Sequence, residues 1–147
     1  MSPKPISVLL VEDDGDDVLL TKDALQRSKL SIQLEVVDNG EQAIAFLQHT
    51  PPYHDAPTPD LILLDLNLPR KNGWEVLEII RQEAHLNPIP VIILTTSNQD
   101  PDIQRAYEMG ANSFVTKPVG LEEFHKVVQS IEDFWLTIVK LPRQLKQ

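Results

Sequence analysis

Carboxylates that follow apolar runs are the side chains of this sequence best placed to do chemistry. Asp65 ends a run that is apolar from 61 to 64, and Glu12 and Asp13 follow a second apolar run. Apolar runs of about four to eight residues are typical of strands buried on both faces of a parallel sheet. Such sheets bind ligands beyond the carboxyl ends of their strands. We therefore expect these carboxylates to meet at one sheet edge, with Asp65 as a nucleophile.

A hydroxyl group and an ammonium group also follow strand-like runs. Thr95 comes after the run 91–94, and Lys117 comes directly after the run 113–116. A threonine hydroxyl and a lysine ammonium both donate hydrogen bonds that suit phosphate oxygens. Carboxylates are hard ligands for Mg²⁺, and an aspartate can form an acyl phosphate. The pattern predicts phosphoryl chemistry at Asp65, next to a Mg²⁺ ion.

Two further acids, Asp16 and Asp17, stand at the start of a predicted helix over residues 15–28. Acidic side chains in the first turn of a helix are common and usually stay in water. We therefore expect both carboxylates to be solvated and to lie outside the phosphate site.

The hydrophobic pattern alternates between strand and helix five times, which predicts a doubly wound α/β domain with helices on both faces of a parallel sheet. The loop over 49–59 contains four prolines and cannot be helical. A single domain is expected over 1–147. Five strands are predicted near 7–11, 33–37, 60–65, 91–94 and 113–116.

The apolar pattern of the last helix continues into an extended helix and tail at about 132–147. Five apolar side chains of this segment are expected beyond the core: Phe134, Trp135, Ile138, Val139 and Leu141. Large exposed apolar patches usually mark interfaces. The segment is therefore predicted to contact a partner or a second copy of the chain. The alternative is that it folds back over the edge of its own domain.

Composition excludes several classes of protein. The 147 residues carry a formal net charge of −9, which argues against nucleic-acid binding because that binding relies on Lys and Arg. No apolar run approaches about 20 residues, so no membrane span is expected. The chain has no cysteine, which excludes disulfides and thiolate metal sites. No secretory signal is visible, so a cytoplasmic location is expected.

Together, the motifs resemble the receiver domain of two-component response regulators. The matching stretches are Leu-Val-Glu-Asp-Asp at 10–14, Leu-Leu-Asp-Leu-Asn-Leu-Pro at 63–69, Leu-Thr-Thr at 94–96 and Ala-Asn-Ser-Phe-Val-Thr-Lys-Pro at 111–118. Thr95 lies 30 residues after Asp65, and Lys117 lies 22 residues after Thr95, as in that family. The resemblance implies a flavodoxin-like sheet with strand order 2-1-3-4-5.

The same resemblance implies a role for each site residue. Asp65 would accept a phosphoryl group from a histidine of a sensor kinase, and Thr95 and Lys117 would bind that group. The implied Mg²⁺ ligands are Asp13, Asp65 and the carbonyl of Asn67, with Glu12 assisting: Glu12, Asp13, Asp65, Asn67.

A switch and its output are implied as well. Thr95 and Phe114 would couple phosphorylation to the face formed by the fourth helix, fifth strand and fifth helix. That face and the tail residues Phe134, Trp135 and Ile138 would form a homodimer or bind a downstream protein. Too little chain follows the last helix for a DNA-binding output domain, so output is expected through docking.

The proline-rich loop and the C-terminal tail most resemble single-domain regulators of bacterial, including cyanobacterial, phytochromes. The expected partner is therefore a phytochrome sensor histidine kinase. The Lys117–Pro118 bond is usually cis in the family, whereas the sequence alone leaves cis and trans open.

Two other functions fit the predicted fold less well. A phosphatase of the haloacid dehalogenase type needs a second aspartate two residues after its nucleophile, and here that residue is Asn67. A flavin- or nucleotide-binding module needs phosphate donors in its first loop, but residues 12–14 are all acids. The pattern favours a signalling switch that transforms no metabolite.

Overall fold

The five predicted strands pair side by side, all in parallel, in one sheet. The structure is a computed structural model, and it describes residues 5–28 and 30–142. The sheet has the order β2-β1-β3-β4-β5, which confirms the predicted strand order. Its strands are β1 (Ile6–Val11), β2 (Ile32–Val37), β3 (Leu61–Leu64), β4 (Val91–Thr95) and β5 (Ser113–Thr116).

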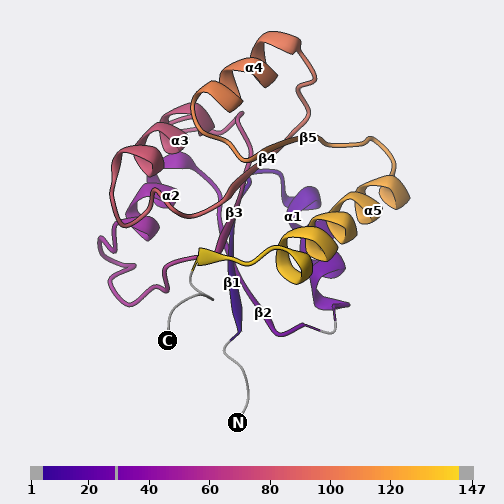
Figure 1. The fold of residues 1–147 in the computed structure, drawn as a ribbon, viewed down its shortest axis with the longest axis horizontal. Coiled ribbons are helices and arrows are strands. Elements are labelled where there is room, and N and C mark those ends of the chain that lie inside the picture. The colour runs from indigo at the N-terminus through magenta and orange to yellow at the C-terminus, as the bar shows by residue number, and fades with distance from the viewer. Residues whose placement is uncertain (1–4, 29, 143–147) are drawn as a thin grey trace.

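Helices cover both faces of the sheet, with α2, α3 and α4 on one side and α1 and α5 on the other (Figure 1). Within the described ranges, no helix is both long and apolar enough to cross a membrane. The helices are α1 (Gly15–Gln26), α2 (Gly40–Leu47), α3 (Gly73–Gln82), α4 (Asp100–Glu108) and α5 (Leu121–Ile131), followed by a π-helix, Glu132–Ile138.

The central strands β1, β3 and β4 are almost entirely apolar because both of their faces are buried. In β1, Leu9 and Val11 pack on the α2 and α3 side, whereas Val8 and Leu10 point to the opposite core. Successive side chains of a strand point to opposite faces, so a strand between two helix layers needs apolar residues at every position. This burial holds the strand ends, and the polar residues that follow them, in a fixed register.

The C-terminal segment folds back over its own sheet, which overturns part of the sequence prediction. Leu141 is fully buried in the cluster that contains Val8, Leu10 and Leu63. The prediction that Leu141 lies beyond the core is therefore wrong. Helical spacing identifies an apolar face, but it does not say whether that face covers the same chain or another one.

The remaining residues of this segment differ in their exposure. The Phe134 side chain is 51% exposed, and its ring meets the ring of the half-buried Trp135 edge to face, with centroids 5.6 Å apart. The side chain of Ile138 and residues 143–147 lie outside the described part of the structure. The segment thus has one face in the core and an aromatic residue in solvent.

The buried position of Leu141 leads to a stability prediction. Leu141→Ala removes a side chain that is 0% exposed and leaves a cavity, so it should lower the free energy of unfolding by about 2 to 4 kcal/mol. The same substitution at Leu121, which is 67% exposed, should cost about 0.5 kcal/mol or less. Urea denaturation of both variants measures the difference. Equal losses would contradict the packing of Leu141 in the core.

Candidate functional site

The loop after β3 places Asp65 at the carboxyl edge of the sheet. The Asp65 amide donates a hydrogen bond of 3.1 Å to the carbonyl of Val11, which ties the ends of β1 and β3 together. The start of α3 approaches the same backbone so closely that a Cβ atom at Gly73 would lie 2.3 Å from the Asp65 carbonyl oxygen. Only glycine fits at this position.

Three carboxylates meet beside Asp65. Glu12, Asp13 and Asp65 each offer an oxygen, and these oxygens all lie within 4.8 Å of one another. Glu12 and Asp65 are buried, whereas Asp13 is exposed. One divalent cation can contact all three, and carboxylate oxygens are suitable ligands for Mg²⁺. The backbone amide of Asn67 donates a hydrogen bond of 3.2 Å to Asp65 Oδ1, which helps to orient the carboxylate.

The Lys117 ammonium group binds three carboxylates at once. Its Nζ donates hydrogen bonds to Glu12 Oε1, to Asp17 Oδ2 at 2.8 Å and to Asp65 Oδ2 at 3.1 Å. The Lys117 side chain is only 4% exposed. An ammonium has three donors, so this buried cation is fully hydrogen-bonded. The structure therefore confirms the prediction that Glu12, Asp65 and Lys117 lie close together.

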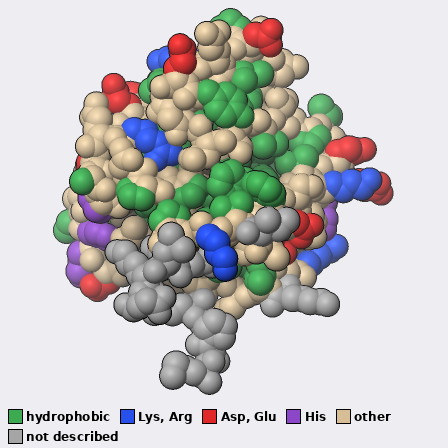
Figure 2. Space-filling model, in the orientation of Figure 1, with side chains coloured by type: hydrophobic (Ala, Val, Ile, Leu, Met, Phe, Trp, Pro, Cys, Tyr) green, Lys and Arg blue, Asp and Glu red, His purple; other side chains and the backbone are tan. Residues whose placement is uncertain are grey.

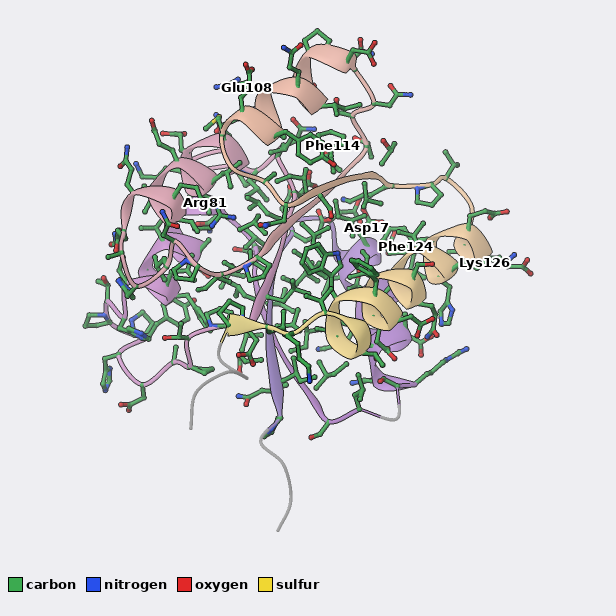
Figure 3. The ribbon with its side chains drawn as sticks, in the orientation of Figure 1. Asp17, Arg81, Glu108, Phe114, Phe124 and Lys126 are labelled. Carbon is green, nitrogen blue, oxygen red and sulfur yellow. The ribbon has the colours of Figure 1, made fainter. Side chains whose placement is uncertain are left out.

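Asp17 is one of the three carboxylates that bind Lys117, which the sequence analysis missed. The Asp14 side chain caps α1 by accepting hydrogen bonds from the amides of Asp16 and Asp17. Asp17 then lies at the end of α1 that faces the site (Figure 3), and its carboxylate reaches Lys117. The prediction that Asp17 is solvated outside the site is wrong, whereas Asp16 is exposed as expected. The one available signal was its place in the first turn of a helix that starts at the site.

Two groups of the site have raised pKa values, which favour the neutral form of Glu12 and the charged form of Lys117. Burial raises the pKa of Glu12 to about 7, and the negative charge of Asp65 adds to this effect, although the hydrogen bond from Lys117 opposes it. Burial disfavours the charged form of Lys117, but its hydrogen bonds to Asp17 and Glu12 more than offset that penalty. The pKa of Lys117 is therefore raised, and the ammonium stays charged.

Thr95 ends β4 beside the cluster. The Lys117 amide donates a 2.6 Å hydrogen bond to the Thr95 carbonyl, so the ends of β4 and β5 are joined. The Thr95 side chain is fully buried, and its hydroxyl has no hydrogen-bond partner among the described residues. A buried hydroxyl without a partner is costly, so this group gains if an acceptor enters the site.

Phe114 on β5 is half-buried and packs on the core beneath α4 (Figure 3). Its backbone amide donates a hydrogen bond of 3.1 Å to the hydroxyl of Tyr107 on α4. The sequence analysis did not identify this contact. Further along α4, the guanidinium of Arg105 lies 4.2 Å from the ring centroid of Trp74, which connects α4 with α3.

The Lys117–Pro118 bond is trans, because the one cis peptide bond within the described ranges is Pro51–Pro52.

A shallow apolar groove of about 300 Å³ lies between β5, α5 and the C-terminal segment. Hydrophobic side chains gather on this face of the molecule, in the region of α4, β5 and α5 (Figure 2). The groove includes two of the three predicted interface residues, Phe134 and Trp135. Its lining is Ile92, Ser113, Val115, Lys126, Val127, Ser130, Ile131, Phe134 and Trp135.

Comparison with known proteins identifies the family. The response regulator receiver domain family matches residues 8–129. The response regulator Rcp1 of Synechocystis sp. is 45% identical over 141 residues, which cover 96% of each chain. The crystal structure of its Mn²⁺-bound form superposes with a TM-score of 0.91 and covers 94% of this chain and 99% of that one. The phosphorylated cyanobacterial phytochrome response regulator RcpA is 40% identical, with a TM-score of 0.92 and coverage of 95% and 99%.

The raised pKa of Glu12 predicts how stability depends on pH. Between about pH 4.5 and 7 the folded protein holds a proton on Glu12 that the unfolded chain has lost. Raising the pH therefore disfavours folding, and the metal-free protein should lose on the order of 2 to 3 kcal/mol of unfolding free energy between pH 5 and 8 from this group.

Urea denaturation in EDTA at several pH values measures this loss. Glu12→Gln keeps the shape of the side chain but does not titrate, so its stability should change less with pH than that of the wild type. If the unfolding free energies of the two proteins change equally with pH, Glu12 is not the group responsible for the pH dependence.

Proposed function

The chain belongs to the response regulator receiver domain family, and we propose that it is a switch controlled by phosphorylation of Asp65. The observation that carries this proposal is the contact between the Lys117 ammonium and the Asp65 carboxylate at the edge of the sheet. A carboxylate held beside a buried cation is set up to become an acyl phosphate, because the cation can bind the incoming phosphoryl oxygens.

In this proposal a phosphohistidine of a sensor kinase donates the phosphoryl group. One Asp65 oxygen attacks phosphorus, so a new P–O bond forms while the P–N bond breaks. The electron pair of the P–N bond stays on the imidazole, which takes up a proton. Lys117 binds a phosphoryl oxygen during transfer, and later attack of water on phosphorus returns free Asp65 and inorganic phosphate. The protein acts as a signalling receiver and transforms no metabolite.

Mg²⁺ is the proposed cofactor, held by Glu12, Asp13, Asp65 and the carbonyl of Asn67. The donor set supports it, because three carboxylate oxygens within 4.8 Å of one another can bind one divalent cation together. When bound, Mg²⁺ neutralises part of the negative charge of the phosphoryl group. Receiver domains bind a divalent metal at such an acidic cluster, and the relative Rcp1 has a Mn²⁺-bound form.

The switch would run from Thr95 to α4. We expect the Thr95 hydroxyl to donate a hydrogen bond to the phosphoryl group, because it is buried without a partner in the described structure. Its movement leaves space into which Phe114 can turn, and Phe114 is hydrogen-bonded through its backbone to Tyr107. A shift of Phe114 therefore alters how α4 is held. Phosphorylation would be read as a change on the face formed by α4, β5 and α5.

We propose a phytochrome sensor histidine kinase as the phosphoryl donor. The support is similarity to the cyanobacterial phytochrome response regulator RcpA over nearly the whole chain. One receiver domain over residues 1–147 would then act through protein docking and bind no nucleic acid, in line with its net charge of −9.

Docking would use the apolar groove and the C-terminal segment. We propose that a second copy of the chain binds there, through Phe134, Trp135 and Ile138, and that a downstream protein reads the same face. The exposed ring of Phe134 beside the groove supports the proposal, because aromatic side chains at the centre of an apolar patch commonly dominate binding energy.

Phosphorylation of Asp65 can be tested with acetyl phosphate and Mg²⁺. Asp65→Asn should abolish labelling, because an amide oxygen is a poor nucleophile and cannot form the acyl phosphate. Asp55→Asn changes an aspartate on the proline-rich loop whose side chain is 92% exposed, and it should label like the wild type. Intact-mass spectrometry measures the added phosphate. Labelling of Asp65→Asn at another residue would remove Asp65 from its role.

The homodimer can be tested by sedimentation velocity, with and without phosphorylation. Phe134→Ala should weaken dimerisation by at least about tenfold with only a small loss of folding stability, because about half of its surface is exposed in the monomer. Leu19→Ala removes a similarly exposed apolar side chain on α1, outside the groove, and should have no effect. A wild-type protein that stays monomeric in both states would contradict the proposed dimer.

A further inference from the structure

We propose that Asp17 is a positioning residue of the phosphorylation site. It holds the Lys117 ammonium in place while Glu12 and Asp65, the other two partners of Lys117, change their contacts as a metal ion and a phosphoryl group bind. The inference rests on the proposed function of Asp65. It starts from the three hydrogen bonds of Lys117 to Glu12, Asp17 and Asp65.

The three partners of Lys117 differ in what else they are required to do. Glu12 and Asp65 both belong to the carboxylate cluster that can hold a divalent cation. Asp65 is in addition the proposed phosphoryl acceptor, so one of its oxygens becomes part of an acyl phosphate. Asp17 is not among the residues of that cluster. It is the one partner of Lys117 whose bond does not have to change when a metal ion and a phosphoryl group arrive.

The backbone of Asp17 is held rigidly, as a positioning residue requires. Its amide donates a hydrogen bond of 3.1 Å to the Asp14 side chain, which caps α1. Its carbonyl accepts a hydrogen bond of 2.8 Å from the hydroxyl of Thr21, and Thr21 is almost fully buried. The carboxylate therefore extends from a fixed helical turn to Lys117, across 100 residues of sequence.

Asp17 also supplies charge where Lys117 needs it. Burial of the ammonium is costly unless it is paired with hydrogen-bonded anions. If Glu12 and Asp65 are drawn toward a metal ion, the Asp17 carboxylate can still accept its hydrogen bond from Lys117, and its side chain, 21% exposed, keeps some contact with solvent. Without Asp17, the ammonium is held only by Glu12 and Asp65, and it moves when they move. It is then less well placed to bind the phosphoryl oxygens.

The test compares Asp17→Asn with Asp16→Asn. Both variants remove one negative charge from the first turn of α1, but Asp16 is exposed and is not one of the three carboxylates to which Lys117 donates its hydrogen bonds. The first measurement needs neither metal nor phosphate: NMR of the ¹⁵N-labelled Lys117 ammonium gives the rate at which its protons exchange with water. We expect exchange to be about tenfold faster in Asp17→Asn, and unchanged in Asp16→Asn, because one of three hydrogen bonds to a carboxylate is weakened.

The second measurement is the rate of phosphorylation by acetyl phosphate in Mg²⁺. The maximal rate should fall about tenfold in Asp17→Asn, while the acetyl phosphate concentration that gives half of that rate stays the same. Asp17→Glu keeps the charge and should recover part of the rate. It also provides a second variant if Asp17→Asn fails to fold.

The outcomes separate this inference from the function on which it rests. A wild-type protein that is not phosphorylated at Asp65 would overturn the proposed function. Wild-type labelling with equal maximal rates in Asp17→Asn and Asp16→Asn would overturn the role of Asp17 alone. Asp17→Asn that is less stable to urea but is phosphorylated at the wild-type rate would show a structural ion pair, and it would also overturn the positioning role.

Discussion

One buried ammonium group makes the acidic edge of this sheet possible. Lys117 hydrogen-bonds to Glu12, Asp17 and Asp65, three carboxylates that would otherwise repel one another in a partly dehydrated site. The cation stays charged because these acids raise its pKa more than burial lowers it. Removing the ammonium would leave uncompensated buried charge, which is far more costly than the loss of a surface ion pair.

The two sides of the site are held with different stiffness. On the sheet side, hydrogen bonds from Asp65 to Val11 and from Lys117 to Thr95 join neighbouring strand ends. On the other side, Ala106 is the one residue of α4 that is buried. The side-chain contacts of α4 with its neighbours include the hydroxyl of Tyr107, which accepts a hydrogen bond from the backbone amide of Phe114 on β5. A change at the proposed phosphorylation site would therefore move α4 more easily than it would distort the sheet.

The C-terminal segment shows where periodicity stops being informative. The apolar spacing there led to the prediction of one exposed interface, but the structure divides the same residues between two roles. Leu141 completes the core on the α5 side of the sheet, whereas the ring of Phe134 remains in solvent beside a groove. Both residues contribute equally to the sequence pattern. Burial depends on where the chain turns after the π-helix, and that turn is set by packing with distant strands.

The sequence by itself determined the parallel sheet and the ends of the strands at which Asp65 and Lys117 lie, because strands buried on both faces are apolar along their length. The strand order followed from the resemblance of the motifs to receiver domains. Parallel strands also end at one edge, so polar residues after four of them had to come together. What only the tertiary structure decided was which further side chains reach that edge: Asp17 lies 100 residues from Lys117, and its type and local position resemble those of the exposed Asp16. Packing of α1 on the sheet distinguishes the two: Asp17 lies on the same face of α1 as the buried Thr21 and Ala24, whereas Asp16 is exposed, and which face is covered is a property of the folded core.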